Sequence, residues 1–262
     1  MSLDRVSFGG LGALRRDGEG TPFVLLHGIG SAPESFLPMA GALGRNAPVL
    51  AWDMPGYGGS ADLAPEWPDA GDYAAALAAL LDGAGIARCV LLGHSLGVVT
   101  AARFTRLYPE RVALFAALSP ALGYGVPRGG ALPQGIQARL DDLERLGPEG
   151  MAALRAARLV FEPEKRPAVL GAVRGAMGRV RPPGYRRASL LLAGADVLAD
   201  AAAIRVPSLV VSGAEDVVTP PANAERLAAA LGIEAHLVPG AGHALPQEKP
   251  ETVAALLREA LS

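Results

Sequence analysis

Residues 89–97 read CVLLGHSLG, and this stretch decides the fold. Its first four residues form a short apolar run that is typical of a buried strand, and a helical pattern follows over residues 96–108. Between the two lies the pattern Gly-x-Ser-x-Gly, in which a tight strand-to-helix turn holds Ser95 in a strained backbone conformation. Because Gly93 and Gly97 have no side chain, neighbouring backbone can pass close to the turn. In this context the pattern predicts a nucleophilic Ser95 whose hydroxyl is lifted clear of the sheet, rather than an ordinary strand-to-helix turn.

Short apolar runs alternate with helical patterns on both sides of this stretch. Strands are predicted over residues 23–26, 48–52, 89–92, 112–118, 208–212 and 235–238. Helices are predicted over residues 73–81, 96–108, 222–231 and 251–261, and a leading hairpin over residues 4–16. This alternation is typical of an α/β protein, in which helices flank a mostly parallel sheet.

The alternation stops between residues 121 and 191. This part of the chain has no convincing strand, only Arg- and Glu-bearing helical stretches that are interrupted by prolines. Because the strand–helix pattern resumes afterwards with the same character, we interpret residues 121–191 as an inserted helical cap. Residues 1–120 and 192–262 would then form one core domain. The alternative is that the middle part is a small separate domain.

Composition narrows the class of protein. A chain of 262 residues with half of them apolar fits one large α/β domain. With 24 Lys and Arg against 26 Asp and Glu, the formal charge is −2, which gives no reason to expect a nucleic acid or an anionic membrane as partner. The one cysteine, Cys89, excludes an intramolecular disulfide and is interpreted as a core residue. No apolar segment reaches the roughly 18 residues of a membrane span, and Met1–Val6 does not resemble a secretory signal, so we expect a cytoplasmic protein.

A serine nucleophile needs a base within hydrogen-bond reach, and the chain offers four histidines. His94 adjoins Ser95 and is predicted to point away from it and pack. His27 belongs to a glycine-rich turn, and His236 lies inside a strand at a core or edge position. His243 ends the loop Gly-Ala-Gly-His directly after the last strand, at the edge of the sheet where Ser95 is expected. His243 is therefore the predicted base.

The third member of a triad should be a carboxylate at the same edge, between the serine and the histidine in chain order. Asp216 follows the penultimate strand and meets both conditions. Glu215 is expected to point elsewhere, and Asp196 and Asp200 precede that strand. We therefore predict that Asp216 orients the base and stabilises its charged form.

Two backbone amides are predicted to bind the oxyanion that develops on the substrate. One is the amide of Leu96, directly after the nucleophile, and the other is that of Ile29 in the turn His-Gly-Ile-Gly. This turn lacks the third glycine of a dinucleotide-binding fingerprint. The chain also has no phosphate-binding loop and no Cys/His metal spacing, so we predict neither a cofactor nor a metal.

Five stretches together resemble the α/β-hydrolase fold family across essentially the whole chain. They are Leu25–Gly28, Asp53–Ser60, Gly93–Gly97, Gly213–Asp216 and Gly240–His243. The resemblance implies an eight-stranded core sheet with the cap over the active site. It also implies Ser95, Asp216 and His243 as the catalytic triad and the amides of Ile29 and Leu96 as the oxyanion hole.

Within that family the chain is most similar to small capped members: enol-lactonases, carboxylesterases and C–C bond hydrolases. It departs from the C–C hydrolase pattern, because Ala244 follows His243 where those enzymes usually carry a tryptophan, and because the early loop lacks their Gly-Pro-Gly stretch. The dehalogenase and epoxide-hydrolase branches use aspartate at the position of Ser95, which disfavours both.

The working hypothesis is hydrolysis of a small carboxylic ester or lactone through an acyl-enzyme on Ser95. One alternative is C–C bond hydrolysis of a ring-cleavage-type diketone with the same triad. A second is a ligand-binding receptor with slow turnover, and a scaffold without chemistry ranks below both. Several arginines of residues 121–191 are candidates for pairing with a substrate carboxylate: Arg155, Arg158, Arg174, Arg179, Arg186 and Arg187. The sequence selects neither the substrate nor the oligomeric state.

Overall fold

The computed structural model describes residues 3–262, so Met1 and Ser2 of the N-terminal stretch considered above lie outside the described residues. One sheet has the strand order β1-β2-β4-β3-β5-β6-β7-β8. The strands are β1 (Asp4–Phe8), β2 (Leu11–Arg16), β3 (Phe23–Leu26), β4 (Val49–Trp52), β5 (Cys89–His94), β6 (Val112–Leu118), β7 (Ser208–Gly213) and β8 (Ala235–Val238). The β1–β2 hairpin is antiparallel and pairs antiparallel with β4, and the remaining pairings are parallel. The predicted mostly parallel eight-stranded sheet is confirmed, including the leading hairpin.

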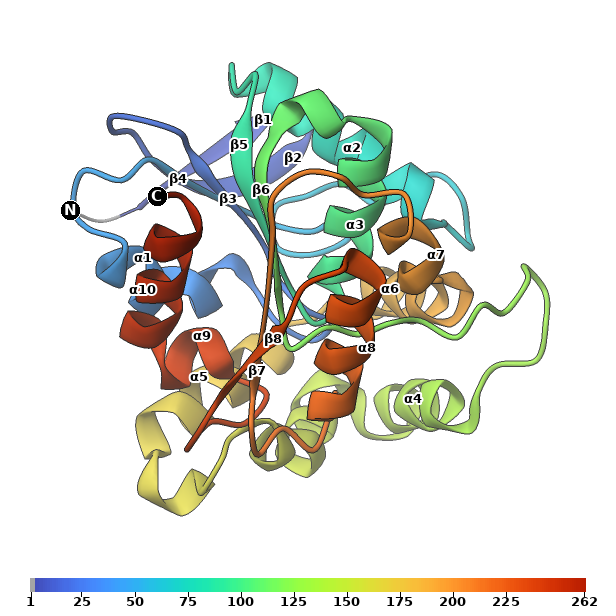
Figure 1. Cartoon of the computed structure of the whole chain (residues 1–262). Helices are drawn as coiled ribbons and strands as arrows, with labels where there is room; N and C mark the ends of the chain where they lie inside the picture. The colour runs from blue at the N-terminus through green and yellow to red at the C-terminus, as the bar shows by residue number, and fades with distance from the viewer. Residues whose placement is uncertain (1–2) are drawn as a thin grey trace.

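Helices cover both faces of this sheet (Figure 1). Around it lie α1 (Leu37–Ala42), α2 (Ala70–Gly83), α3 (Gly97–Leu107), α8 (Pro221–Leu231), α9 (Leu245–Glu248) and α10 (Pro250–Ala260), with short 3-10 turns at η1 (Pro33–Phe36) and η2 (Pro109–Arg111). Strand β5 shows why both faces need cover, since successive side chains of a strand point to opposite sides. Cys89 and Leu91 belong to the apolar cluster that includes residues of α2, α3 and α8, whereas Val90 and Leu92 belong to the cluster that includes residues of α1 and α10.

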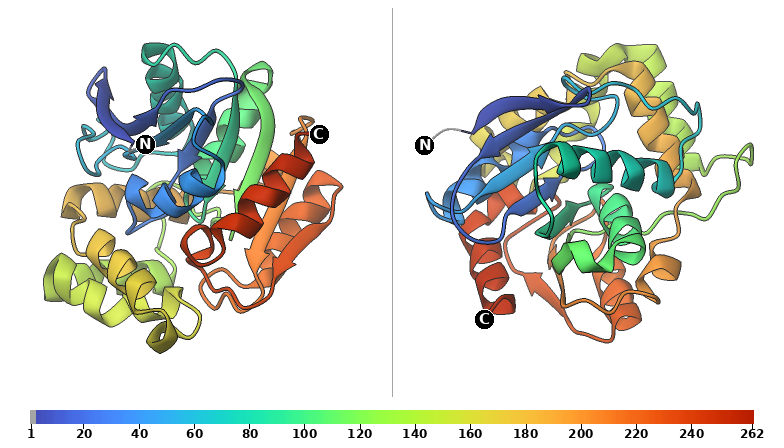
Figure 2. Two further views of the ribbon diagram at one scale, coloured as in Figure 1. Left: turned by 90° about the vertical axis from the view of Figure 1, so that its left-hand side faces the viewer. Right: turned by 90° about the horizontal axis from the view of Figure 1, so that it is seen from above.

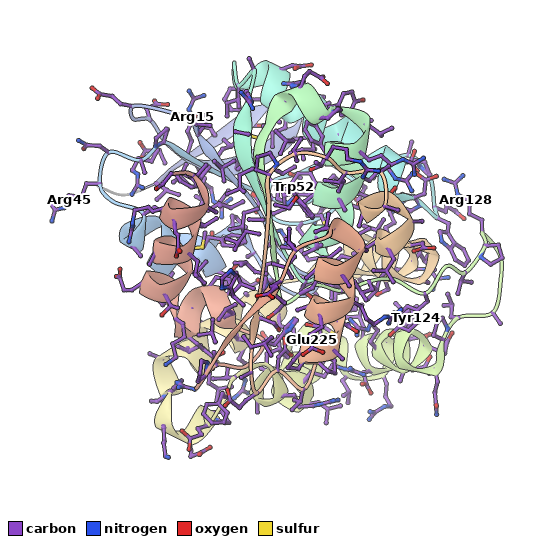
Figure 3. The ribbon with its side chains drawn as sticks, viewed as in Figure 1. Arg15, Arg45, Trp52, Tyr124, Arg128 and Glu225 are labelled. Atoms are coloured by element: carbon purple, nitrogen blue, oxygen red, sulfur yellow. The ribbon has the colours of Figure 1, made fainter. Side chains whose placement is uncertain are left out.

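The core of the protein is apolar, and charged side chains lie around it. Figure 3 shows Trp52 of β4 in the interior, whereas charged side chains such as Arg45 and Arg128 lie at the periphery. Cys89 is buried, as predicted, and burial raises the pKa of its thiol to about 12. Among residues 3–262, no helix combines the length and the apolar character that crossing a membrane requires.

Between β6 and β7 the described chain forms helices and loops but no strand. The helices are α4 (Gln134–Arg155), η3 (Ala156–Leu159), η4 (Pro163–Lys165), α5 (Pro167–Met177), α6 (Pro182–Gly194) and α7 (Val197–Ala201). Helix α4 is interrupted before Pro148, because Gly147 has a φ of 67° and the two helical runs meet there at a kink. Figures 1 and 2 place α4 and α5 beyond one end of the sheet. We refer to residues 121–191 below as the inserted segment.

Candidate active site

Ser95 lies in a strained turn between β5 and α3. Its φ of 54° falls in the left-handed region that residues with a side chain rarely adopt. A Cβ atom at position 93 would lie 2.5 Å from the Val98 nitrogen, and one at position 97 would lie 2.0 Å from the Leu26 oxygen. Only glycine fits at either position. The Gly-x-Ser-x-Gly spacing therefore has a packing cause, and it presents the serine at the carboxyl edge of the sheet.

His243 and Asp216 form a buried hydrogen-bonded pair at the same edge. The Nδ1 atom of His243 lies 2.8 Å from Oδ2 of Asp216, and the two side chains are 4% and 0% exposed. The other oxygen, Oδ1, accepts hydrogen bonds from the amides of Val218 and Thr219 at 2.8 and 3.0 Å. Burial raises the pKa of Asp216, but His243 and these amides outweigh it and lower the pKa to about 2. The carboxylate is thus ionised at neutral pH and can only accept, which fixes the imidazole proton on Nδ1.

Thr219 is a member of this site that sequence reasoning missed. Its hydroxyl lies 2.9 Å from Oδ2 of Asp216, 3.1 Å from Nδ1 of His243 and 2.9 Å from the carbonyl oxygen of Ser119. The hydroxyl therefore bridges the carboxylate to the end of β6. A threonine three residues after an aspartate is too common a pattern to have singled it out.

Ser95 and His243 line the same cavity, whose volume is 590 Å³. The side-chain hydrogen bonds of His243 go to Asp216 and Thr219, and Ser95 Oγ is not among its partners in the described part of the chain. Hydrogen bonds between a nucleophile and its base are often long before substrate binds. The three residues predicted for the triad are thus brought to one edge of the sheet, with the carboxylate–imidazole contact formed.

His94 contacts the predicted base instead of merely packing. Its Nε2 atom lies 2.7 Å from the carbonyl oxygen of His243, and the two imidazole rings have centroids 4.9 Å apart. Burial and the neighbouring His243 lower the pKa of His94 to about 3, so the ring is neutral and donates from Nε2. The contact joins residues 149 positions apart, and nothing in the local sequence indicates it.

Glu248 connects the loop of His243 to the inserted segment. Its buried carboxylate accepts hydrogen bonds from the amides of Gly242 and Phe161, both at 2.8 Å, and pairs with Arg166 at 3.2 Å. Phe161 and Arg166 belong to the inserted segment, whereas Gly242 directly precedes the predicted base. Glu248 therefore links the backbone before the predicted base to the inserted segment.

His27 shapes the loop that follows β3. Its Nδ1 atom lies 2.9 Å from the Gly28 oxygen, and its Nε2 atom accepts from the Met54 amide at 3.1 Å. Burial lowers the pKa of His27, which keeps the ring neutral and able to donate at one nitrogen while accepting at the other. The side chain thus fixes the backbone that carries Ile29.

Two backbone amides are available beside Ser95. Within residues 3–262, neither the Ile29 nor the Leu96 nitrogen donates a hydrogen bond to another group. Leu96 is the N-cap of α3, and Ile29 lines the cavity. A Cβ atom at position 28 would lie 2.9 Å from the Cβ atom of Ser95, so this loop is packed directly against the serine. Unpaired amides next to a nucleophile can bind a developing oxyanion.

The other sequence candidates have different partners. His236 is exposed on the edge strand β8, and Glu215 accepts from the Ala241 amide at 3.0 Å. Asp196 caps α7, and Asp200 is buried against Arg103 and Arg106. The three alternative carboxylates therefore all lie outside the contact with His243.

Arginines line the cavity that contains Ser95. Of the six that the sequence suggested, Arg155 and Arg158 contribute to its wall, and the other four do not. Arg139 of α4 and Arg226 of α8 also line it, although no sequence pattern distinguished them. Their convergence follows from the tertiary arrangement of separate helices.

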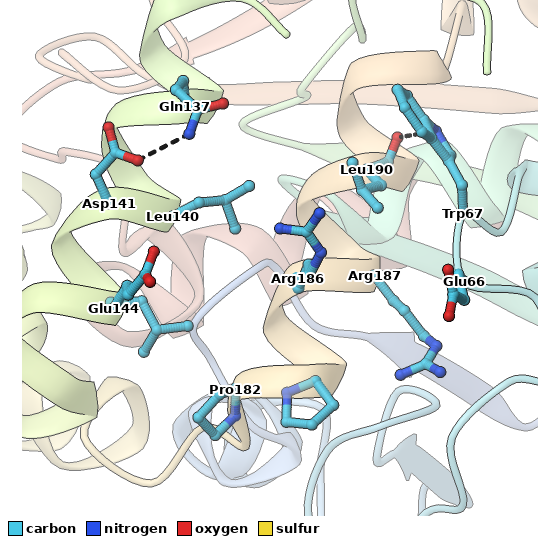
Figure 4. Close-up of a pocket in the computed structure, with 12 residues that line it drawn as sticks. Glu66, Trp67, Gln137, Leu140, Asp141, Glu144, Pro182, Arg186, Arg187 and Leu190 are labelled. Atoms are coloured by element: carbon cyan, nitrogen blue, oxygen red, sulfur yellow. Dashed lines mark hydrogen bonds between the residues drawn. The ribbon is translucent and has the colours of Figure 1, made fainter. Parts of the chain in front are cut away.

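A second cavity, of 710 Å³, lies between α4, α6 and the loop of Trp67 (Figure 4). Its wall includes the hydrogen bonds of Gln137 to Asp141 at 2.7 Å and of Trp67 Nε1 to the Leu190 oxygen at 3.1 Å. Its lining residues include no serine, cysteine or histidine, and so offer no nucleophile–base pair. No cluster of three His, Cys, Asp or Glu side chains suited to a metal ion occurs over residues 3–262.

Comparison with known sequences gives matches along most of the chain. A family model described as the alpha/beta hydrolase family matches residues 23–256. The protein RutD of Shigella flexneri, which bears the name of a carbamate hydrolase, is 28% identical over 249 residues, covering 91% of this chain and 90% of that protein. A stretch of 119 residues is 37% identical to the dihydrolipoyllysine-residue acetyltransferase component of the acetoin cleaving system of Pseudomonas putida, covering 45% of this chain and 32% of that protein.

Solved structures share the fold over nearly the full length. The enol-lactonase from Burkholderia xenovorans superimposes with a TM-score of 0.84 at 24% identity, covering 98% of this chain and 99% of that one. A thermophilic esterase from Thermogutta terrifontis gives a TM-score of 0.83 at 26% identity, covering 100% of this chain and 97% of that one.

Proposed function

Because the chain belongs to the α/β-hydrolase family, we propose that it is a serine hydrolase that cleaves a small carboxylic ester or lactone. Family membership confirms the resemblance drawn from the sequence. The observation that carries the proposal is the meeting, around one cavity, of the strained Ser95, the His243–Asp216 pair and the unpaired amides of Ile29 and Leu96.

In the proposed acylation step, Ser95 Oγ attacks the carbonyl carbon of the substrate while His243 Nε2 takes its proton. The negative charge that forms on the carbonyl oxygen is bound by the two amides. Asp216 stabilises the imidazolium. The tetrahedral adduct then collapses: the bond between its carbon and the alkoxide oxygen breaks, that oxygen takes the imidazolium proton, and the acyl group stays on Ser95. In the second step, water attacks the acyl-enzyme with His243 again as base, which releases the acid and restores Ser95.

We further propose that the inserted segment, residues 121–191, acts as a cap over a core formed by residues 1–120 and 192–262. Eleven of its residues line the cavity, among them Arg139, Arg155, Arg158, Leu159 and Met177. A volume of 590 Å³ suits a small-molecule substrate. The cap would then set substrate specificity, whereas the core supplies the reacting groups.

The named activities of relatives support acyl transfer to water as the reaction class. The similar structure at 26% identity is an esterase, and the relative at 28% identity is named for carbamate hydrolysis. Esters, lactones and carbamates all present a carbonyl carbon that a serine can attack and a heteroatom that can leave.

The proposal is tested by labelling and by a substrate panel. A fluorophosphonate probe should label the protein at Ser95, and Ser95→Ala should abolish labelling and turnover. The panel compares aryl esters, lactones, an aryl carbamate and a vinylogous 1,5-diketone. Preferred cleavage of the diketone would replace the proposal by C–C hydrolysis, and tight binding with turnover near zero would favour a receptor. A protein that is not labelled at Ser95 would remove the covalent scheme.

A further inference from the structure

The wall of the cavity at Ser95 carries positive charge only. Four arginines line it, and its lining residues include no aspartate or glutamate. They come from three elements: Arg139 and Arg155 from α4, Arg158 from η3 and Arg226 from α8. Like charges gathered at one opening repel one another, and the repulsion is offset when an anion binds among them.

Three of these arginines have no carboxylate partner within residues 3–262. Arg155 is paired with Asp142 through its Nη2 atom at 2.5 Å. Arg139 donates only to the Gly135 oxygen of its own helix, at 3.4 Å. Arg158 and Arg226 form neither a side-chain hydrogen bond nor a salt bridge in this part of the chain, and both are exposed. The contrast with Arg155 separates a structural arginine from three that are available to a ligand.

Two helix N-termini add to the positive potential. Gly135, in the first turn of the 22-residue helix α4, lines the cavity, and so do Pro220 and Asn223 at the start of the 11-residue helix α8. The N-terminal end of a helix carries partial positive charge and favours an anion nearby. Arginine side chains and backbone dipoles therefore act in the same direction.

Arg139 is less exposed than Arg158 and Arg226, which line the same cavity. It is half-buried and lies close enough to the Tyr57 hydroxyl to counteract, in part, the rise that burial causes in the pKa of Tyr57. That hydroxyl lies 3.4 Å from the amide of Gly30, next to Ile29. The three arginines without a carboxylate partner thus comprise one that is half-buried, Arg139, and two that are exposed, Arg158 and Arg226.

We propose that the substrate is anionic: an ester or lactone that carries a carboxylate, bound by Arg158 and Arg226 at the mouth of the cavity with Arg139 on its inner side. A guanidinium presents paired N–H donors that match the two oxygens of a carboxylate. This inference rests on the proposed function and specifies the substrate class of the same site.

The test uses two ethyl esters that differ only in charge. Monoethyl adipate carries a carboxylate at the far end, and its counterpart carries a primary carboxamide of nearly the same shape. Hydrolysis is followed by acid release at constant pH. Wild-type protein should hydrolyse the half-ester with a kcat/KM at least about 10-fold above that of the amide, and added salt should reduce this preference.

Arginine variants test which side chains cause the preference for the anionic ester. Arg158→Gln combined with Arg226→Gln should lower kcat/KM for the half-ester by about 10-fold or more and change that for the amide by less than about twofold. Arg174→Gln is the matched control, because Arg174 is also an exposed arginine of the inserted segment but does not line this cavity. It should leave both substrates unaffected.

Binding to Ser95→Ala separates this inference from the proposed function. Calorimetric titration with monoethyl adipate should detect binding that the Arg158→Gln/Arg226→Gln pair weakens by about 10-fold. If labelled, active protein shows no charge preference and the arginine pair leaves binding unchanged, the anionic subsite is wrong while the hydrolase proposal stands. If Ser95 is not labelled but binding still depends on the arginines, the proposed hydrolysis fails and the anion site stands.

Discussion

Replacement of Asp216 by Asn tests the proposed role of Asp216 in orienting His243 as the base for Ser95. Oδ1 of Asp216 accepts from the amides of Val218 and Thr219 at 2.8 and 3.0 Å. An amide NH₂ at that place would face two donors, so Asn must put its oxygen there and its NH₂ at the place of Oδ2. The NH₂ then lies next to Nδ1 of His243, which can only accept from it. The imidazole proton is forced onto Nε2, and His243 can no longer take the proton of Ser95.

The expected cost is large for activity and small for folding. A base in the wrong tautomer lowers kcat by about 10,000-fold, which corresponds to about 5 kcal/mol of transition-state stabilisation. The hydrogen bonds of the Asn oxygen persist, and the Thr219 hydroxyl keeps the Ser119 oxygen as acceptor at 2.9 Å. At neutral pH the change in free energy of unfolding should therefore stay within about 3 kcal/mol.

The assay combines ester turnover, the rate of fluorophosphonate labelling and urea unfolding. Asp196→Asn is the control, because Asp196 is an exposed helix cap and Asn caps helices equally well. It should retain activity and stability. If Asp216→Asn kept turnover within tenfold of wild type while remaining folded, the assignment of Asp216 as the orienting carboxylate would be wrong.

Three further predictions address the turn at Ser95, the loss of stability at acid pH and the loop after β3. Gly97→Ala should lower the free energy of unfolding in urea by about 3 kcal/mol or more, because the new Cβ would lie 2.0 Å from the Leu26 oxygen. The control is Gly41→Ala, which has open space around it and should not destabilise the protein. Equal urea midpoints for the two variants would contradict this packing argument. The pKa of Asp216 is lowered from 3.8 to about 2, so its ionisation contributes about 2 kcal/mol of stability above pH 4 that is lost as the pH falls toward 2. The difference in unfolding free energy between wild type and Asp216→Asn should shrink over that range, and a constant difference would refute the linkage. His27→Phe should slow fluorophosphonate labelling by about tenfold, because the backbone of the predicted oxyanion loop loses both hydrogen bonds to the His27 side chain. An unchanged labelling rate would show that His27 does not support the oxyanion loop.

The sequence predicted the sheet well because each buried strand leaves a local signal. Residues 112–118 form an apolar run that matches β6 residue for residue, and residues 23–26 match β3. The short helices α1 and α9 were missed, since six and four residues are too few to show a helical period. Prolines were expected to interrupt the helical stretches of residues 121–191, and Pro148 does so, because it follows the non-helical Gly147 inside α4.

The candidate site was likewise predictable only in part. The placement of Ser95, Asp216 and His243 at one edge of the sheet was predictable, because each follows a predicted strand and strand ends in a parallel sheet share one edge. The contacts that hold them were not found. His94 packs on His243 from 149 positions away in the sequence, and Glu248 accepts from the Phe161 amide, so both contacts depend on tertiary placement. Residue type and spacing carry no information about such distant pairs.

The most direct test is a crystal structure of the protein after reaction with a phosphonate probe. The account predicts a covalent bond from phosphorus to Ser95 Oγ, with the phosphoryl oxygen within about 3.2 Å of the Ile29 and Leu96 nitrogens. It also predicts that His243 Nε2 faces the ester oxygen of the adduct. An adduct on another residue, or a phosphoryl oxygen directed away from both amides, would contradict the account.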